Sequence, residues 1–193
     1  MPLKFWNTPL LEKSEVNIGW VARQTYNVPS WGVHVFENEH CGTNGLHPCA
    51  GVLIVNPTEG LNDVLVGHYL TGPGHEWLLE TIRSTAQQAF PDFAEVRAFL
   101  WWASLNTYNA FPQPEVELLF LNGVITNRKS VLELCSTLWI TPEHIHTEWD
   151  RRSNPADRIQ EAQMWYDPTT KQVTYVYLGD EWYRENIISL DSK

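Results

Sequence analysis

Two side chains of complementary chemistry, the thiol of Cys49 and the imidazole of His68, lie on two short apolar segments separated by a turn signal. The first segment, Ala50–Val55, ends at an Asn-Pro-Thr-Glu-Gly sequence at 56–60, and the second covers residues 63–70. Apolar runs around such a turn predict a β-hairpin. An imidazolium stabilises a neighbouring thiolate, which is the reactive nucleophile, so the pair predicts nucleophilic catalysis.

The register of this hairpin decides whether the thiol meets the imidazole. A loop centred between Thr58 and Glu59 places Cys49 directly opposite His68, with Cβ atoms ~4.5–5.5 Å apart on one sheet face. A slip of one residue would move His68 to the other face. We therefore expect direct pairing of these two residues.

Two glycines are expected to leave space around the pair. Gly51 lies beside it and would leave room for a substrate, and Gly67 would let a backbone approach closely. The alternative interpretation is that Cys49 is a small buried core residue and that His68 lies at a sheet edge.

The rest of the chain alternates short strand signals with two helical patterns. Helices are predicted at 76–90, where Pro91 ends an apolar face, and at 127–139, where Cys135 lies on the apolar face. Residues 1–30 read as irregular and 37–48 as a polar loop. Further strands are predicted at 32–36, 96–102, 115–121, 160–167 and 172–178. This irregular order predicts an α+β fold with antiparallel pairing rather than a doubly wound sheet.

Composition limits the class of protein. The chain has 193 residues, of which 43% are hydrophobic and 19% charged, which predicts one folded domain and excludes a disordered chain or a coiled coil. The net charge of −10 disfavours nucleic acid and anionic membranes as partners. No apolar run reaches the ~20 residues of a membrane span, and the N-terminus does not resemble a secretory signal. Three cysteines predict reduced thiols and a cytoplasmic location, or delivery into a host cytoplasm.

A longer pattern surrounds the pair: Thr43-Asn-Gly-Leu-His-Pro-Cys49-Ala-Gly-Val, then a strand, an Asn-Pro turn and Gly67-His68-Tyr-Leu. This pattern resembles the chemotaxis receptor glutamine deamidases (the CheD family). That family shows T-x-G-L-G-S-C, a strand, an Asp-Pro turn and a His on the return strand. The order of later elements is also similar, up to the hairpin at 160–178.

The resemblance implies a fold of packed mixed or antiparallel β-sheets flanked by helices, shared with cytotoxic necrotizing factor. It implies a single domain over 1–193, with an N-terminal extension (1–38), a core (39–178) and a C-terminal tail (179–193). It also implies that Cys49 is the nucleophile and His68 the base, and that Thr43 completes the site. The expected reaction is hydrolysis of a protein glutamine amide to glutamate and ammonia, with no cofactor and no metal. The expected partner is a protein that carries the target glutamine, and a regulatory protein is a further candidate.

The sequence departs from the family pattern at several positions. His47 and Pro48 replace small residues before the cysteine, and Trp101-Trp102-Ala103 stands at the place of a Gly-Gly-Ala motif. These bulky tryptophans are expected to reshape the substrate groove, with one of them in the core.

Other interpretations of the same residues remain open. His40, Cys41, His47 and Cys49 form a cluster of zinc-type ligands, and His144-Ile-His146 would put two imidazoles on one strand face. Oxidation would link Cys41 to Cys49 in a regulatory disulfide. The alternative function is a catalytically silent adaptor or inhibitor on the same fold, which binds a protein through an acidic surface rich in tryptophan.

Overall fold

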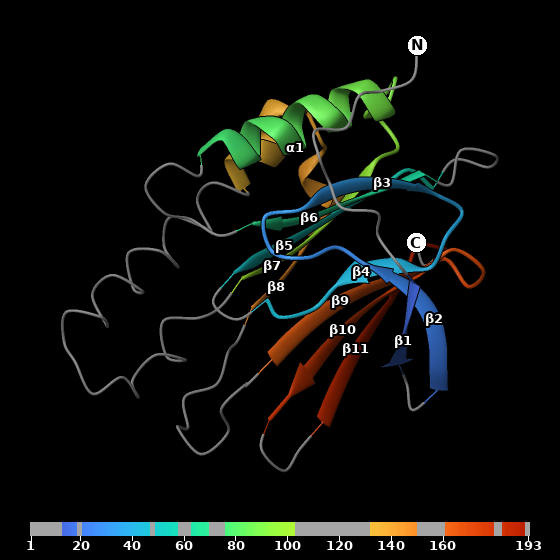
Figure 1. Cartoon of the computed structure of the whole chain (residues 1–193). Coiled ribbons are helices and arrows are strands. Elements are labelled where there is room, and N and C mark those ends of the chain that lie inside the picture. The colour runs from blue at the N-terminus through green and yellow to red at the C-terminus, as the bar shows by residue number, and fades with distance from the viewer. Residues whose placement is uncertain are drawn as a thin grey trace, which may run out of the picture.

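Two β-sheets lie face to face and share an apolar core, and helices cover the outer face of one of them (Figure 1). The computed structural model describes residues 13–18, 21–46, 49–57, 63–69, 76–102, 132–149, 161–179 and 183–191.

Within these described residues, the first sheet has six strands in the order β1-β2-β4-β9-β10-β11, and the second has five in the order β3-β6-β5-β7-β8. The strands of the first sheet are β1 (Lys13–Ile18), β2 (Val21–Asn27), β4 (Cys41–Thr43), β9 (Glu161–Asp167), β10 (Gln172–Leu178) and β11 (Tyr183–Ser189). Those of the second are β3 (Val33–Glu37), β5 (Ala50–Val55), β6 (Asp63–Tyr69), β7 (Arg97–Trp102) and β8 (Ile145–Trp149).

Among the described strand pairs, β2–β4 and β7–β8 are parallel and the others are antiparallel. The prediction of an α+β fold with packed mixed sheets is therefore confirmed.

Strand β5 shows why these sequences form a two-sided sheet. All six of its residues are buried, because Leu53 and Val55 face the other sheet while Val52 and Ile54 face the helices. An uninterrupted apolar run is what a strand covered on both faces requires. The core between the sheets therefore begins directly behind Cys49.

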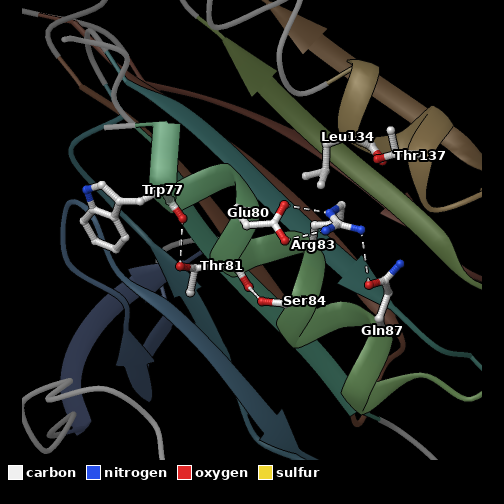
Figure 2. A network of polar contacts seen from close by, with 8 residues as sticks. All are labelled: Trp77, Glu80, Thr81, Arg83, Ser84, Gln87, Leu134 and Thr137. Carbon is white, nitrogen blue, oxygen red and sulfur yellow. Dashed lines mark hydrogen bonds and ion pairs between the residues drawn. The ribbon is translucent and has the colours of Figure 1, made fainter. Parts of the chain in front are cut away.

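Helix α1 (Glu76–Ala89) packs on the outer face of the second sheet through Leu78, Ile82 and Ala86. Figure 2 shows its polar face, where Arg83 contacts Glu80 and Gln87. These are local contacts between exposed residues three and four apart on one helix, where solvent weakens them. This polar face lies outside the core between the sheets.

A second helix at 132–137 packs on the same outer face, with Leu134, Cys135 and Leu138 buried as predicted. Its end is marked by Trp139, which has φ 57° and a side chain that is 87% exposed. The amide of Ile140 donates to the carbonyl of Cys135 across this end. A left-handed residue at this position is usually glycine, so the tryptophan strains the helix terminus.

Most of the predicted elements are confirmed within one or two residues: β3, β5, β6, α1, β7 and the β9–β10 hairpin. The strand predicted at 115–121 and the first residues of the helix predicted at 127–139 lie outside the described residues.

The prediction that residues 1–30 are irregular is wrong, because β1 and β2 form an antiparallel hairpin there. The prediction of a loop over 37–48 missed β4, which pairs with β2 and β9. Strands β8 and β11 were also missed. The segment expected as an N-terminal extension thus supplies β1, β2 and β3, and the segment expected as a C-terminal tail supplies β11, which pairs with β10.

Candidate active site

The β5–β6 hairpin forms as predicted, but its register differs by two residues. Gly51 pairs with His68 and Leu53 pairs with Val66, so the predicted pairing of Cys49 with His68 is wrong. A shift of two residues keeps every side chain on its face, whereas a shift of one would have reversed it. Cys49 lies one residue before β5, and the alternation of the strand places it on the face of His68.

The thiol and the imidazole are therefore diagonal rather than direct neighbours. Cys49 precedes by two residues the glycine that opposes His68. Diagonal positions in an antiparallel pair are separated by about 7–8 Å between backbones, which aromatic and long side chains still bridge. Among the described contacts of these two residues there is no hydrogen bond between the thiol and the imidazole, so the strands place them on one face without joining them.

The two glycines do not play the predicted roles. A Cβ atom at Gly51 would lie 2.4 Å from the sulfur of Met164 and 2.8 Å from a methyl group of Leu46, so core side chains fill the space expected for substrate. At Gly67 the close neighbour is the side chain of Ile82 on α1, 3.0 Å from a Cβ atom, rather than a backbone. Both glycines therefore allow close packing of core side chains.

Thr43 and His68 are brought into direct contact. The hydroxyl of Thr43 lies 2.7 Å from Nδ1 of His68 and donates to the carbonyl of Val28, also at 2.7 Å. A threonine hydroxyl has a single proton. With that proton directed to Val28, the imidazole must donate through Nδ1–H. His68 is thereby held in the tautomer whose Nε2 lone pair is free to accept a proton.

Strand β4 holds Thr43 in place from both sides. Gly42 pairs with Trp165 on β9, and a Cβ atom at Gly42 would lie 2.0 Å from the carbonyl oxygen of Met164, so no side chain fits there. On the other side, Asn27 exchanges two hydrogen bonds with Asn44, at 3.0 and 3.1 Å. Backbone pairing with β9 and the hydrogen bonds between Asn44 and Asn27 of β2 together fix the position of Thr43 beside the imidazole of His68.

A turn that sequence reasoning missed lies on the other side of the imidazole. Ser30 belongs to the turn Pro29–Gly32, closed by a hydrogen bond from the Gly32 amide to the Pro29 carbonyl at 2.9 Å. Its hydroxyl is 3.5 Å from Nε2 of His68. Proline and glycine at the ends of 29–32 were a turn signal, but a tryptophan in the left-handed region within that turn (Trp31, φ 63°) has no such signature.

Burial keeps the thiol and the imidazole neutral. It raises the pKa of Cys49 to about 12 and lowers the pKa of His68 to about 4, although a hydrogen bond to the Val28 carbonyl acts in the opposite direction on the histidine. Their side chains are 4% and 1% exposed. The expected imidazolium–thiolate pair is therefore disfavoured in this structure, because burial favours the neutral form of both groups.

The residues of the alternative metal sites are separated. Cys41 is buried in the core between the sheets, where burial raises its pKa, and His40 lies 3.5 Å from Asp167. His144 belongs to a short 3-10 helix (Pro142–His144), so it does not share a strand face with His146, as the alternative metal site would require. Among the described residues no group of three possible ligands gathers, and His47 lies outside them. All three cysteines are free thiols.

A second polar cluster, also missed from the sequence, lies at the β8 edge of the second sheet. Glu148 accepts hydrogen bonds from Tyr177 at 3.2 Å and from Asn186 at 2.6 Å, and it lies 3.3 Å from His146. These hydrogen bonds lower the pKa of Glu148 against the effect of burial, which raises it. Because the partners come from β8, β10 and β11, this carboxylate ties the two sheets together.

The paired tryptophans do not form a surface. Trp101 is buried between the sheets and Trp102 on the helix side, so both belong to the core. Among the tryptophans whose side chains the structure describes, Trp31, Trp77 and Trp139 are exposed.

Comparisons of the chain with protein-family models, with curated proteins and with solved structures gave no match. In the part of the chain that the structure describes, no helix combines the length and apolar character needed to cross a membrane.

Proposed function

We propose that the protein is a cysteine-dependent protein-glutamine deamidase in which Cys49 is the nucleophile, His68 the base and Thr43 the residue that positions the base. The observation that carries the proposal is the contact of 2.7 Å between Thr43 and Nδ1 of His68, on the sheet face that Cys49 shares. A buried imidazole whose Nδ1 is held by Thr43, and whose Nε2 can accept a proton, is suited to general-base catalysis.

The first half of the reaction forms a thioester. Nε2 of His68 removes the proton of Cys49 while the sulfur attacks the carboxamide carbon of the substrate glutamine. The resulting imidazolium, still hydrogen-bonded to Thr43 through Nδ1, gives its Nε2 proton to the amide nitrogen. The C–N bond then breaks and ammonia leaves, which restores the neutral histidine.

The second half regenerates the enzyme. Nε2 removes a proton from water, and the water oxygen attacks the thioester carbon. The C–S bond breaks, the sulfur takes the proton from His68, and glutamate is released. The sum is one amide and one water converted to one carboxylic acid and one ammonia, with no cofactor required.

The three free cysteines favour a reducing compartment, either the cytoplasm or a host cytoplasm into which the protein is delivered. The proposed partner is a protein that presents a glutamine side chain. A regulatory partner would bind outside the site.

The direct test is incubation with a glutamine-rich unfolded protein such as casein, followed by detection of ammonia and of a ~1 Da mass gain at glutamine, the change expected when an amide becomes an acid. Cys49→Ser should abolish both signals. Cys135→Ser is the matched control, since Cys135 is equally buried and its pKa is also raised to about 12. Deamidation that persists in Cys49→Ser, or its absence with every protein offered, would contradict the proposal.

A second candidate function, the silent adaptor, is favoured by the raised pKa of Cys49 and by the three exposed tryptophans. Iodoacetamide separates the two, because a thiolate displaces its iodide at the methylene carbon and the rate therefore reports how readily each thiol loses its proton. An enzyme should be alkylated at Cys49 faster than at Cys135 near pH 7, and His68→Gln should slow only the first. Equal and slow labelling of both would favour the adaptor.

A further inference from the structure

The turn Pro29–Gly32 is fixed to the main chain of the candidate base itself. The amide of Trp31 donates to the carbonyl of His68, and the amide of His68 donates to the carbonyl of Gly32, both at 3.0 Å. A Cβ atom at Gly32 would lie 2.7 Å from the Pro29 carbonyl oxygen, so the turn closes tightly. These backbone hydrogen bonds therefore hold the main chain of Ser30 beside the imidazole.

Strain is concentrated in this turn. Trp31 adopts φ 63°, a conformation that costs an L-residue about 1–2 kcal/mol. Residues in such conformations persist where the surrounding structure enforces them, and they gather at functional sites. Here the strained residue follows Ser30 directly and is held by its hydrogen bond to His68.

Ser30 marks the side of the imidazole that faces solvent. Ser30 is exposed, whereas His68 is 1% exposed and its other nitrogen is turned inward to Thr43. The distance of 3.5 Å between the serine oxygen and Nε2 is long for a direct hydrogen bond. Two polar atoms at this separation can both reach one water molecule at ordinary lengths of ~2.8 Å.

We infer that Ser30 positions the water that hydrolyses the thioester, and so makes hydrolysis, rather than transfer of the acyl group to an amine, the outcome of the reaction. This inference rests on the proposed function. It assigns a role to Ser30, which lies outside the Thr43–His68 segment that resembles the deamidases.

The chemistry divides between the two side chains. The serine oxygen accepts one hydrogen bond from the water, and Nε2 of His68 accepts the other proton as the water oxygen bonds to the thioester carbon. The C–S bond breaks, and the sulfur of Cys49 recovers the proton from the imidazolium. The serine forms no covalent bond and gains no proton, so it is a positioning residue of the second half of the reaction. Attack by the thiol, in the first half, needs no water and should not depend on it.

The test separates the two halves with p-nitrophenyl acetate, an acylating probe that does not require knowledge of the protein substrate. Acylation of Cys49 appears as a burst of nitrophenolate, and hydrolysis of the acyl-enzyme sets the steady rate. Ser30→Ala should leave the burst rate within about twofold and lower the steady rate about tenfold or more, as loss of a positioned reactant does. Ser30→Thr, which keeps the hydroxyl, should retain the steady rate.

A competing nucleophile gives a second readout. With hydroxylamine present, the fraction of acyl groups released as hydroxamate should rise in Ser30→Ala, because hydroxylamine attacks without the positioned water. Ser136→Ala is the matched control: this exposed serine bonds to a carbonyl of its own helix, and its loss should change neither phase.

Each outcome bears on a different claim. If the burst disappears in Cys49→Ala, the proposed function stands. If Ser30→Ala then leaves the steady rate unchanged, or lowers the burst rate and the steady rate equally, the role of Ser30 is overturned. A wild-type protein without a burst dependent on Cys49 overturns the proposed function, and the inference with it.

Discussion

Replacement of Thr43 by valine tests the geometry on which the proposed catalysis depends. Valine has nearly the same shape as threonine but no hydroxyl, so the core should not collapse. The change removes an atom that lies 2.7 Å from both His68 and the Val28 carbonyl in a fully buried position. Leaving a buried donor with fewer partners costs about 1–3 kcal/mol of folding free energy.

The expected effect on rate is larger than the effect on stability. Without the hydroxyl, Nδ1–H is no longer fixed, so the imidazole is free to rotate or to hold its proton on Nε2, and both arrangements remove the base. We expect acylation of Cys49 to slow by about 10²- to 10⁴-fold, the usual contribution of a positioned base. Thr43→Ser should restore most of the rate, because it returns the hydroxyl at the cost of a methyl-sized space worth about 1 kcal/mol.

The assay measures the burst phase with p-nitrophenyl acetate for Thr43→Val, Thr43→Ser and the wild type, together with urea unfolding of each. Proton NMR of the ring reports which nitrogen of His68 carries the proton. A folded Thr43→Val protein that acylates within about twofold of the wild-type rate would refute the reasoning. Loss of stability alone, with an unchanged rate, would assign the threonine to structure.

Three further predictions follow from single residues. Burial lowers the pKa of His68 from 6.5 to about 4, so the unfolded chain takes up a proton at a higher pH than the folded chain does. The free energy of unfolding is therefore unaffected by this proton above pH 6.5 and falls by about 3 kcal/mol as the pH drops to 4, and urea unfolding of His68→Gln should show a weaker pH dependence over that range. Gly42→Ala should cost about 3 kcal/mol or more and lower the rate, since its Cβ atom would meet the Met164 carbonyl oxygen at 2.0 Å; an unchanged urea midpoint would contradict the fit of β4 against β9. Trp139→Gly should raise stability by about 1 kcal/mol without changing the rate, because glycine adopts φ 57° freely; a lower midpoint would mean that the indole is held by contacts stronger than the strain.

Sequence patterns predicted the hairpin that carries Cys49 and His68, and the face of each side chain, because a uniform apolar run and an Asn-Pro turn are local signals. They did not predict the register. Register follows from turn geometry, and a loop centre one residue further along the chain satisfies the same apolar pattern. The structure brings Thr43 and His68 into contact, while the roles that the family resemblance implied for them stay predictions. The roles assigned to Gly51 and Gly67 depended on packing from distant elements and were wrong.

The missed strands share weak local signals. Strand β1 is largely polar, β4 has three residues, and β11 is only half-buried, so none carries a clear apolar alternation. Such strands form because a neighbouring strand offers backbone groups, which is information from the whole fold. Ser30 was missed for the same reason. Its position near His68 follows from the pairing of β3 with β6 and from a strained turn, and the local sequence around Ser30 predicts neither of them.

The dependence of β4 on β9 has a consequence for synthesis of the protein. A chain still attached to the ribosome carries Ser30, Thr43, Cys49 and His68 long before Glu161–Asp167 has been made. Until then, β4, the strand that carries Thr43, can pair only with β2. The proposed activity should therefore be absent from the growing polypeptide until Glu161–Asp167 has emerged and paired with β4.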